Sequence, residues 1–91
     1  MSCLVRVPAP LRSCTGGADR VEVRGDTIAE VLADLGRMHE PLLKKICGPD
    51  GNVRSFVNVY VNEVDIRRLG GTDAPVCDGD EILLVPAIAG G

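Results

Sequence analysis

The sequence has 91 residues, the length of one small domain, and its 45% hydrophobic and 25% charged residues are ordinary for a globular protein. The net charge of −3, with both signs interleaved along the chain, provides no basic stripe for phosphates and argues against a nucleic-acid partner. Because no apolar run is long enough to span a bilayer and the first residues lack a signal-peptide pattern, we expect no membrane contact and a cytoplasmic location.

Two strands are predicted before the first helix. Residues 3–7 (CLVRV) alternate weakly and end at Pro8, which cannot donate a hydrogen bond to a sheet. Residues 20–24 (RVEVR) alternate cleanly between polar and apolar side chains. Turn-forming residues, including a pair of glycines, fill positions 11–19 between these segments. The pattern predicts a hairpin with a long, loosely defined loop.

The next segment has the pattern of an amphipathic helix. Thr27 and Glu30 form a capping box, in which the hydroxyl accepts from the N–H of Glu30 and the carboxylate accepts from the N–H of Thr27. One apolar stripe follows, made of Ile28, Val31, Leu32, Leu35 and Met38. We expect Pro41 to end the helix and residues 42–47 to add one further turn before the glycine-rich loop 48–52.

The second half of the chain contains three predicted strands. Residues 56–62 (FVNVYVN) give the clearest pattern, and their alternating valines should face the helix. A short strand is predicted around residues 64–67. The last strand, residues 82–85 (ILLV), is apolar on both faces, so it lies in the centre of the sheet or leaves one face for a partner.

The order of these elements is strand, strand, helix, strand, short strand, strand. One main helix laid across a mixed sheet of four to five strands is the ubiquitin-like β-grasp arrangement, and we therefore predict this α+β fold. The first and last strands would lie side by side as a central parallel pair. Residues 1–85 form the predicted domain, and residues 86–91 form an extended, flexible C-terminal tail.

A search for catalytic side chains finds no convincing group. His39 is the only histidine and follows the predicted helix end, where a solvated imidazole stabilised by the helix dipole is the favoured interpretation. Asp78 and Asp80 miss the spacing of a calcium loop, and a tight turn before the last strand explains them better.

The cysteine spacing argues against a metal site and against a disulfide framework. The four residues form no C-x-x-C pair, and a single histidine could not complete a zinc site. We interpret all four as free thiols: Cys3, Cys14, Cys47 and Cys77.

The sequence ends in PAIAGG, and this segment could itself be reactive. Gly90 and Gly91 have no Cβ, so their backbone is narrow enough to enter a slot in another protein. The six residues after Val85 reach about 20 Å when extended. A carboxylate joined to AMP gains a good leaving group, after which a sulfur nucleophile could attack the acyl carbon. We predict that Gly91 carries the reacting carboxyl group and that Gly90 gives it access.

Three segments resemble the β-grasp sulfur carriers of the ThiS and MoaD type: residues 78–91 (DGDEILLVPAIAGG), 56–62 (FVNVYVN) and 25–35 (GDTIAEVLADL). The resemblance covers essentially the whole chain. The TGG of residues 15–17 and the FVN-x-YVN pattern narrow it to the carriers of cysteine synthesis.

The resemblance implies a carrier that partner enzymes act on, rather than an enzyme. A ubiquitin-activating-enzyme-like adenylyltransferase, usually containing zinc, would use ATP to adenylate Gly91, and a sulfurtransferase would then form the thiocarboxylate. In the cysteine branch, a PLP-dependent synthase would accept the sulfur and a zinc metalloprotease would release the product. ATP, zinc and PLP would belong to these partners, and the chain itself would bind no cofactor or metal.

We expect these partners to dock on the sheet face opposite the helix. Strand alternation places four apolar side chains there: Phe56, Tyr60, Leu83 and Val85. The adjoining tail residues should join the contact: Pro86, Ala87, Ile88 and Ala89. The competing interpretation is that these are ordinary exposed apolar residues.

Two other functions stay open from the sequence. The chain could be a ubiquitin-like modifier conjugated through Gly91, or a plain β-grasp interaction module that does not need its tail. The sequence also leaves open which pathway receives the sulfur.

Overall fold

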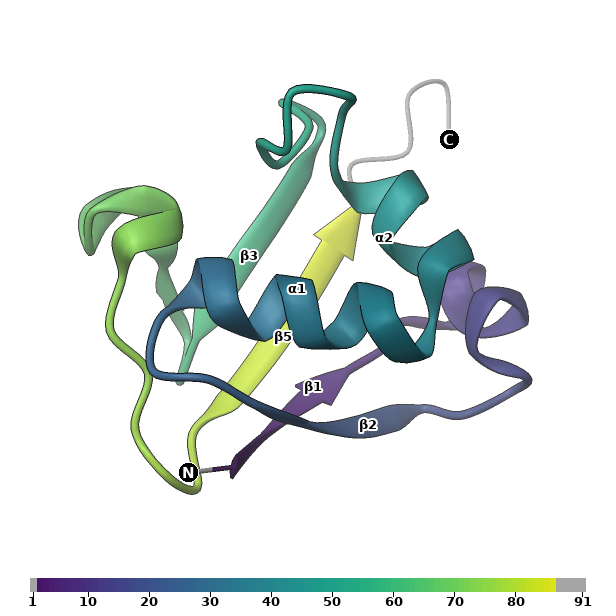
Figure 1. Cartoon of the computed structure of the whole chain (residues 1–91), viewed down its shortest axis with the longest axis horizontal. Helices are drawn as coiled ribbons and strands as arrows, with labels where there is room; N and C mark the ends of the chain where they lie inside the picture. Colours follow the sequence, from purple (N-terminus) through teal and green to yellow (C-terminus); the bar gives the residue numbers. More distant parts are fainter. Residues whose placement is uncertain (1, 87–91) are drawn as a thin grey trace.

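The computed structural model describes residues 2–86, which form one five-stranded mixed sheet covered by helices (Figure 1). The strands are β1 (Ser2–Arg6), β2 (Arg20–Arg24), β3 (Val57–Val61), β4 (Val64–Asp65) and β5 (Glu81–Pro86). Their order across the sheet is β2-β1-β5-β3-β4, with β1 and β5 parallel and all other neighbours antiparallel. The predicted β-grasp fold and its central parallel pair are therefore confirmed.

The main helix, α1 (Ile28–Met38), crosses the sheet, as Figure 1 shows. Its Thr27 cap is confirmed, because the hydroxyl accepts from the N–H of Glu30 at 3.3 Å. The other half of the predicted capping box is wrong by one residue. The Glu30 carboxylate accepts from the N–H of Asp26, at 2.9 Å, and so holds the residue before the cap.

The extra turn predicted after Pro41 is a complete second helix, α2 (Glu40–Ile46). Pro41 lies in its first turn, where the missing N–H would have no helical partner and the fixed φ of proline suits a helix. The backbone of His39 joins the two helices. Its N–H donates to Leu35, and its C=O accepts from Leu42 and Leu43.

Three short 3-10 helices occupy segments predicted as loop or strand. The long loop after β1 contains η1 (Ala9–Thr15), which follows Pro8 directly. The short strand predicted around residues 64–67 is only two residues long, because η2 (Ile66–Arg68) begins directly after β4. A third, η3 (Gly71–Asp73), lies in the connection to β5.

The core lies between the sheet and the helices, and it is aliphatic. All three alternating valines of β3 are buried, as predicted, together with Ile82 and Leu84 of β5. Four members of the predicted α1 stripe are buried: Ile28, Val31, Leu32 and Leu35. Met38 is the exception, with 43% of its surface exposed, because α1 ends there and the chain turns away into α2.

Candidate functional site

The sheet face opposite the helices carries a strip of apolar side chains at its centre. Tyr60 of β3 lies directly opposite Leu83 of β5, and Val85 lies diagonally next to Tyr60. Leu83 is 40% exposed, whereas its neighbours Ile82 and Leu84 are buried in the core. Phe56 lies in the turn just before β3, next to the Val57–Pro86 end of the sheet, and is 49% exposed. These four residues, Phe56, Tyr60, Leu83 and Val85, are called the apolar strip below.

Polar side chains border the strip on both sides, and the sequence analysis did not identify them. On the β1 side, Arg6 pairs with Glu81 at 3.3 Å. On the β4 side, Arg67 pairs with Asp65 at 2.6 Å and donates to Asn58 at 2.7 Å. Strand alternation could have placed Arg6 and Asn58 on this face, but no local pattern indicates that Arg67, outside any strand, would reach it.

Of the two ion pairs that border the strip, Asp65–Arg67 has the shorter contact, 2.6 Å against 3.3 Å for Arg6–Glu81. Hydrogen bonds from the Arg67 side chain, and then from its backbone N–H, lower the pKa of Asp65 to about 2. The same side-chain contact raises the pKa of Arg67. Both groups therefore stay charged through the physiological range and fix one edge of the apolar strip.

Pro86 is the last described residue and lies beside the start of β3. It is the Cα partner of Val57, at the final register position of the β3–β5 pair. The predicted site residues Ala87, Ile88, Ala89, Gly90 and Gly91 lie outside the described residues.

The Asp78-Gly79-Asp80 segment is a turn, as predicted. Asp78 accepts from the N–H of Ser2 at 2.9 Å. Asp80 accepts from the N–H of Cys77 and from the side chain of Asn62, both at 2.8 Å. These carboxylates tie the start of β5 to the N-terminal strand and to the β3–β4 turn, so their oxygens already have structural partners.

All four cysteines are free thiols, in two environments. Cys3 and Cys47 are buried, and burial is the main cause of their raised pKa values. Cys77 is exposed in the connection to β5. Cys14, which was expected in a loop, is half-buried within η1. Within residues 2–86, no three side chains of the His, Cys, Asp or Glu type converge as a metal site would require.

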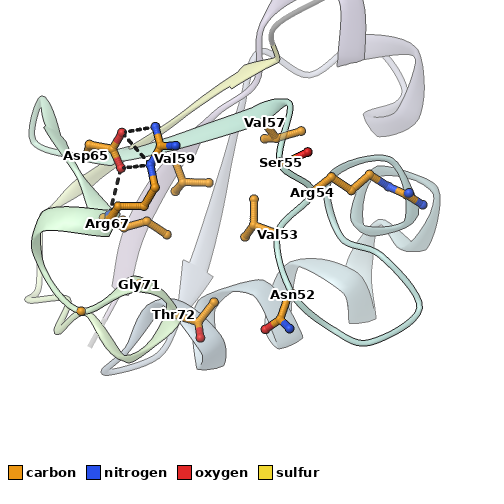
Figure 2. A pocket seen from close by; sticks show the side chains of 12 residues that line it. Asn52, Val53, Arg54, Ser55, Val57, Val59, Asp65, Arg67, Gly71 and Thr72 are labelled. Carbon is orange, nitrogen blue, oxygen red and sulfur yellow. Dashed lines mark hydrogen bonds and ion pairs between the residues drawn. The ribbon is translucent and has the colours of Figure 1, made fainter.

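A cavity of about 350 Å³ lies on the other edge of β3, away from β5 (Figure 2). Its apolar wall contains Val53, Val57 and Val59, and Figure 2 shows Asp65 and Arg67 bonded to each other at its side. None of the sequence-predicted site residues lines this cavity. Its paired charges leave neither side chain as an available base or acid, so the apolar strip is the better candidate site.

Comparison with known proteins shows to which family the chain belongs. A family model described as the ThiS family matches residues 5–91. The chain belongs to the ThiS family. Sulfur carrier protein CysO of Mycobacterium tuberculosis is 38% identical over 93 aligned residues, which cover all of both chains.

Solved structures agree with the ThiS family assignment. A chain in the crystal structure of the Amycolatopsis orientalis BexX/CysO complex matches with a TM-score of 0.90 and 38% identity, over 98% of this chain and 99% of that one. The crystal structure of SAMP1 from Haloferax volcanii matches with a TM-score of 0.84 and 26% identity over all of both chains. The predicted resemblance to β-grasp carriers is confirmed, and so is the prediction of a carrier type rather than an enzyme. Among residues 2–86, no helix has the length and apolar character needed to cross a membrane.

Proposed function

We propose that the chain is a sulfur carrier that reacts at the carboxyl group of Gly91. In the first step, that carboxylate attacks ATP, the acyl adenylate forms and pyrophosphate leaves. The terminal sulfur of a partner's cysteine persulfide then attacks the acyl carbon and AMP leaves. A second thiol of the partner attacks the donor sulfur of the resulting acyl disulfide, which forms a disulfide in the partner and releases the thiocarboxylate. Gly90 gives the reacting end access to the partner's active site. The observation that carries the proposal is the full-length similarity to CysO within a family match that includes residue 91.

The partners would supply the catalytic groups. We assign the first steps to a ubiquitin-activating-enzyme-like adenylyltransferase with a sulfurtransferase activity, which uses ATP and commonly contains zinc. A PLP-dependent cysteine synthase is the proposed sulfur acceptor, and a zinc metalloprotease would release the product. The resemblance of residues 15–17 and 56–62 to the carriers of cysteine synthesis favours that pathway over other sulfur-requiring pathways. The cytoplasmic location remains a prediction, which cell fractionation would test.

We further propose that partners dock on the apolar strip and on the adjoining segment from Pro86 through Ala87, Ile88 and Ala89. The strip lies on the sheet face that no helix of residues 2–86 covers, and it leads to Pro86, where the described part of β5 ends. One relative has been solved in a complex with BexX, so carriers of this kind do associate with other proteins.

Mass spectrometry of protein purified from its own host tests the carrier function. A carrier should include a fraction in which one oxygen is replaced by sulfur, located by fragmentation at Gly91. The matched control is a chain with one residue added after Gly91, which should fold normally but accept no AMP from the activating enzyme. Full AMP transfer to the extended chain would contradict the proposal.

A protein modifier is the second candidate function, and the similarity to SAMP1, a small archaeal modifier protein, favours it over a plain interaction module. In that case, host proteins should carry isopeptide-linked peptides that end at Gly91. A plain interaction module would instead keep its binding and phenotype after deletion of Gly90 and Gly91. That outcome would reject both acyl-transfer functions.

A further inference from the structure

The central parallel pair of strands stops short of the C-terminal end of β5. The register pairs Leu4 with Glu81 and Arg6 with Leu83, and it ends there. The chain of β5 continues to Pro86 beside β3. Among residues 2–86, the last residues of β5 therefore have a neighbouring strand on the β3 side but none on the β1 side.

The hydrogen-bond pattern shows which groups would continue the parallel pair. Leu4 donates to the C=O of Asp80 at 2.9 Å, so its N–H points at the residue before its partner Glu81. In a parallel ladder, the same residue accepts from the residue after its partner, and the pattern repeats every two residues. The next step beyond Arg6 would need the N–H of residue 8 to donate to Leu84 and the N–H of residue 86 to donate to residue 8.

Both of those donors are missing, because residues 8 and 86 are prolines. The C=O of Pro8 accepts from the N–H of Leu11 at 2.9 Å at the start of η1, and its second lone pair could still accept a ladder donor. Neither strand of the central pair can therefore supply the N–H donor that the next step of the ladder needs.

Proline at position 86 does not disturb the β3 side. The N–H of Asn62 donates to the C=O of Glu81 at 2.9 Å, so these two residues form a hydrogen-bonded pair of the antiparallel ladder. Every second pair along β3–β5 is of the same kind, which includes Tyr60–Leu83 and Asn58–Val85. The Val57–Pro86 pair falls between them, at a position that needs no N–H from residue 86. The N–H of Val57 is itself turned away and donates to Arg54 at 3.0 Å. The only ladder bond that Pro86 removes is the one toward β1.

We propose that Pro8 and Pro86 are positioning residues that together end the central parallel ladder, so that Leu84 and Pro86 keep the β1 side of their backbone available to a partner. This inference rests on the proposed function, because it matters only if a partner must bind the backbone at the C-terminal end of β5. A ladder that continued would engage the backbone of Leu84 and residue 86 with the chain's own N-terminal strand. Without the two donors, that backbone stays available to the partner.

The test is the double variant Pro8→Ala/Pro86→Ala, which restores both N–H groups. Hydrogen exchange followed by NMR should show both new amides protected at least about tenfold relative to unstructured peptide. In ATP–pyrophosphate exchange with the host's activating enzyme, kcat should fall about tenfold, because two additional backbone bonds of modest strength must open first. KM should stay within about twofold, because the apolar strip is unchanged.

Pro49→Ala is the matched control, since Pro49 is an exposed proline in the loop between α2 and β3. It should leave kcat unchanged. The single variants Pro8→Ala and Pro86→Ala each restore one donor and should show smaller decreases of kcat with unchanged unfolding midpoints. New amides that exchange like free peptide, or an unchanged kcat in the double variant, would overturn the inference. Absence of activity with the unmodified chain would instead reject the proposed function, and the exchange data would still decide whether the prolines end the ladder.

Discussion

Truncating the apolar strip should weaken docking without unfolding the protein. The informative variant is Phe56→Ala/Leu83→Ala, because these are the two most exposed large side chains of the strip. Neither belongs to the buried core, so the double variant should keep a free energy of unfolding close to that of the unmodified chain.

The expected change in KM follows from the apolar surface of the two side chains that folding leaves exposed to a partner. Full burial of a large apolar side chain stabilises by about 1.5–3 kcal/mol, and docking can bury only the part that folding leaves exposed. With Leu83 40% exposed and Phe56 49% exposed, a partner could gain about 0.6–1.2 kcal/mol from the first and about 0.7–1.5 kcal/mol from the second. The sum, about 1.3–2.7 kcal/mol, corresponds to a rise of about 10- to 100-fold in the KM of the carrier for its activating enzyme.

The assay is adenylation kinetics with the carrier as the varied substrate. Met38→Ala provides the control, because Met38 is 43% exposed but lies at the end of α1, on the opposite side of the sheet. It removes a similar exposed area and should change KM by less than about twofold. An unchanged KM in the double variant, or an equal rise with Met38→Ala, would refute docking on the apolar strip.

Two further predictions concern individual side chains. Asp65 has a folded-state pKa of about 2, below its ordinary value of 3.8, so its contribution to stability is present above about pH 3.8 and is lost as the pH falls through 2. An NMR titration should show this low midpoint, and Arg67→Ala should return it toward the ordinary range; a midpoint that does not move would contradict the pairing. Iodoacetamide should modify exposed Cys77 well before buried Cys3 and Cys47, as measured by peptide mass spectrometry, and early labelling of the buried pair would show that the core opens readily.

Much of the fold could be predicted from local patterns. The alternating valines of residues 57–61, the α1 stripe and the Thr27 cap are set by residues within one or two turns of each other, and period and capping chemistry are local properties. The all-apolar run at Ile82–Val85 predicted a strand that is central in the sheet or leaves one face for a partner. The strand is central, between β1 and β3, and Leu83 is 40% exposed on the face without helices. The reactive end was also a prediction from sequence, and it lies beyond the residues that the structure describes.

Two features were not predicted, because each depends on how elements are arranged and not on periodicity. Met38 fits the periodicity of α1, but the turn into α2 leaves it exposed. Arg67 lies outside any strand, and only the fold brings its guanidinium to Asn58 at the border of the apolar strip. Periodicity alone indicates neither outcome.

The sequence by itself determined the main elements and predicted the chemistry of the chain end, because helical and strand periods, caps and terminal glycines act through bonded neighbours. Only the tertiary structure sets the strand register in which Pro8 and Pro86, 78 positions apart in the chain, would both fall at the next step of the parallel ladder. The register of two distant strands sets which N–H faces which C=O, and no local property of either proline contains that information.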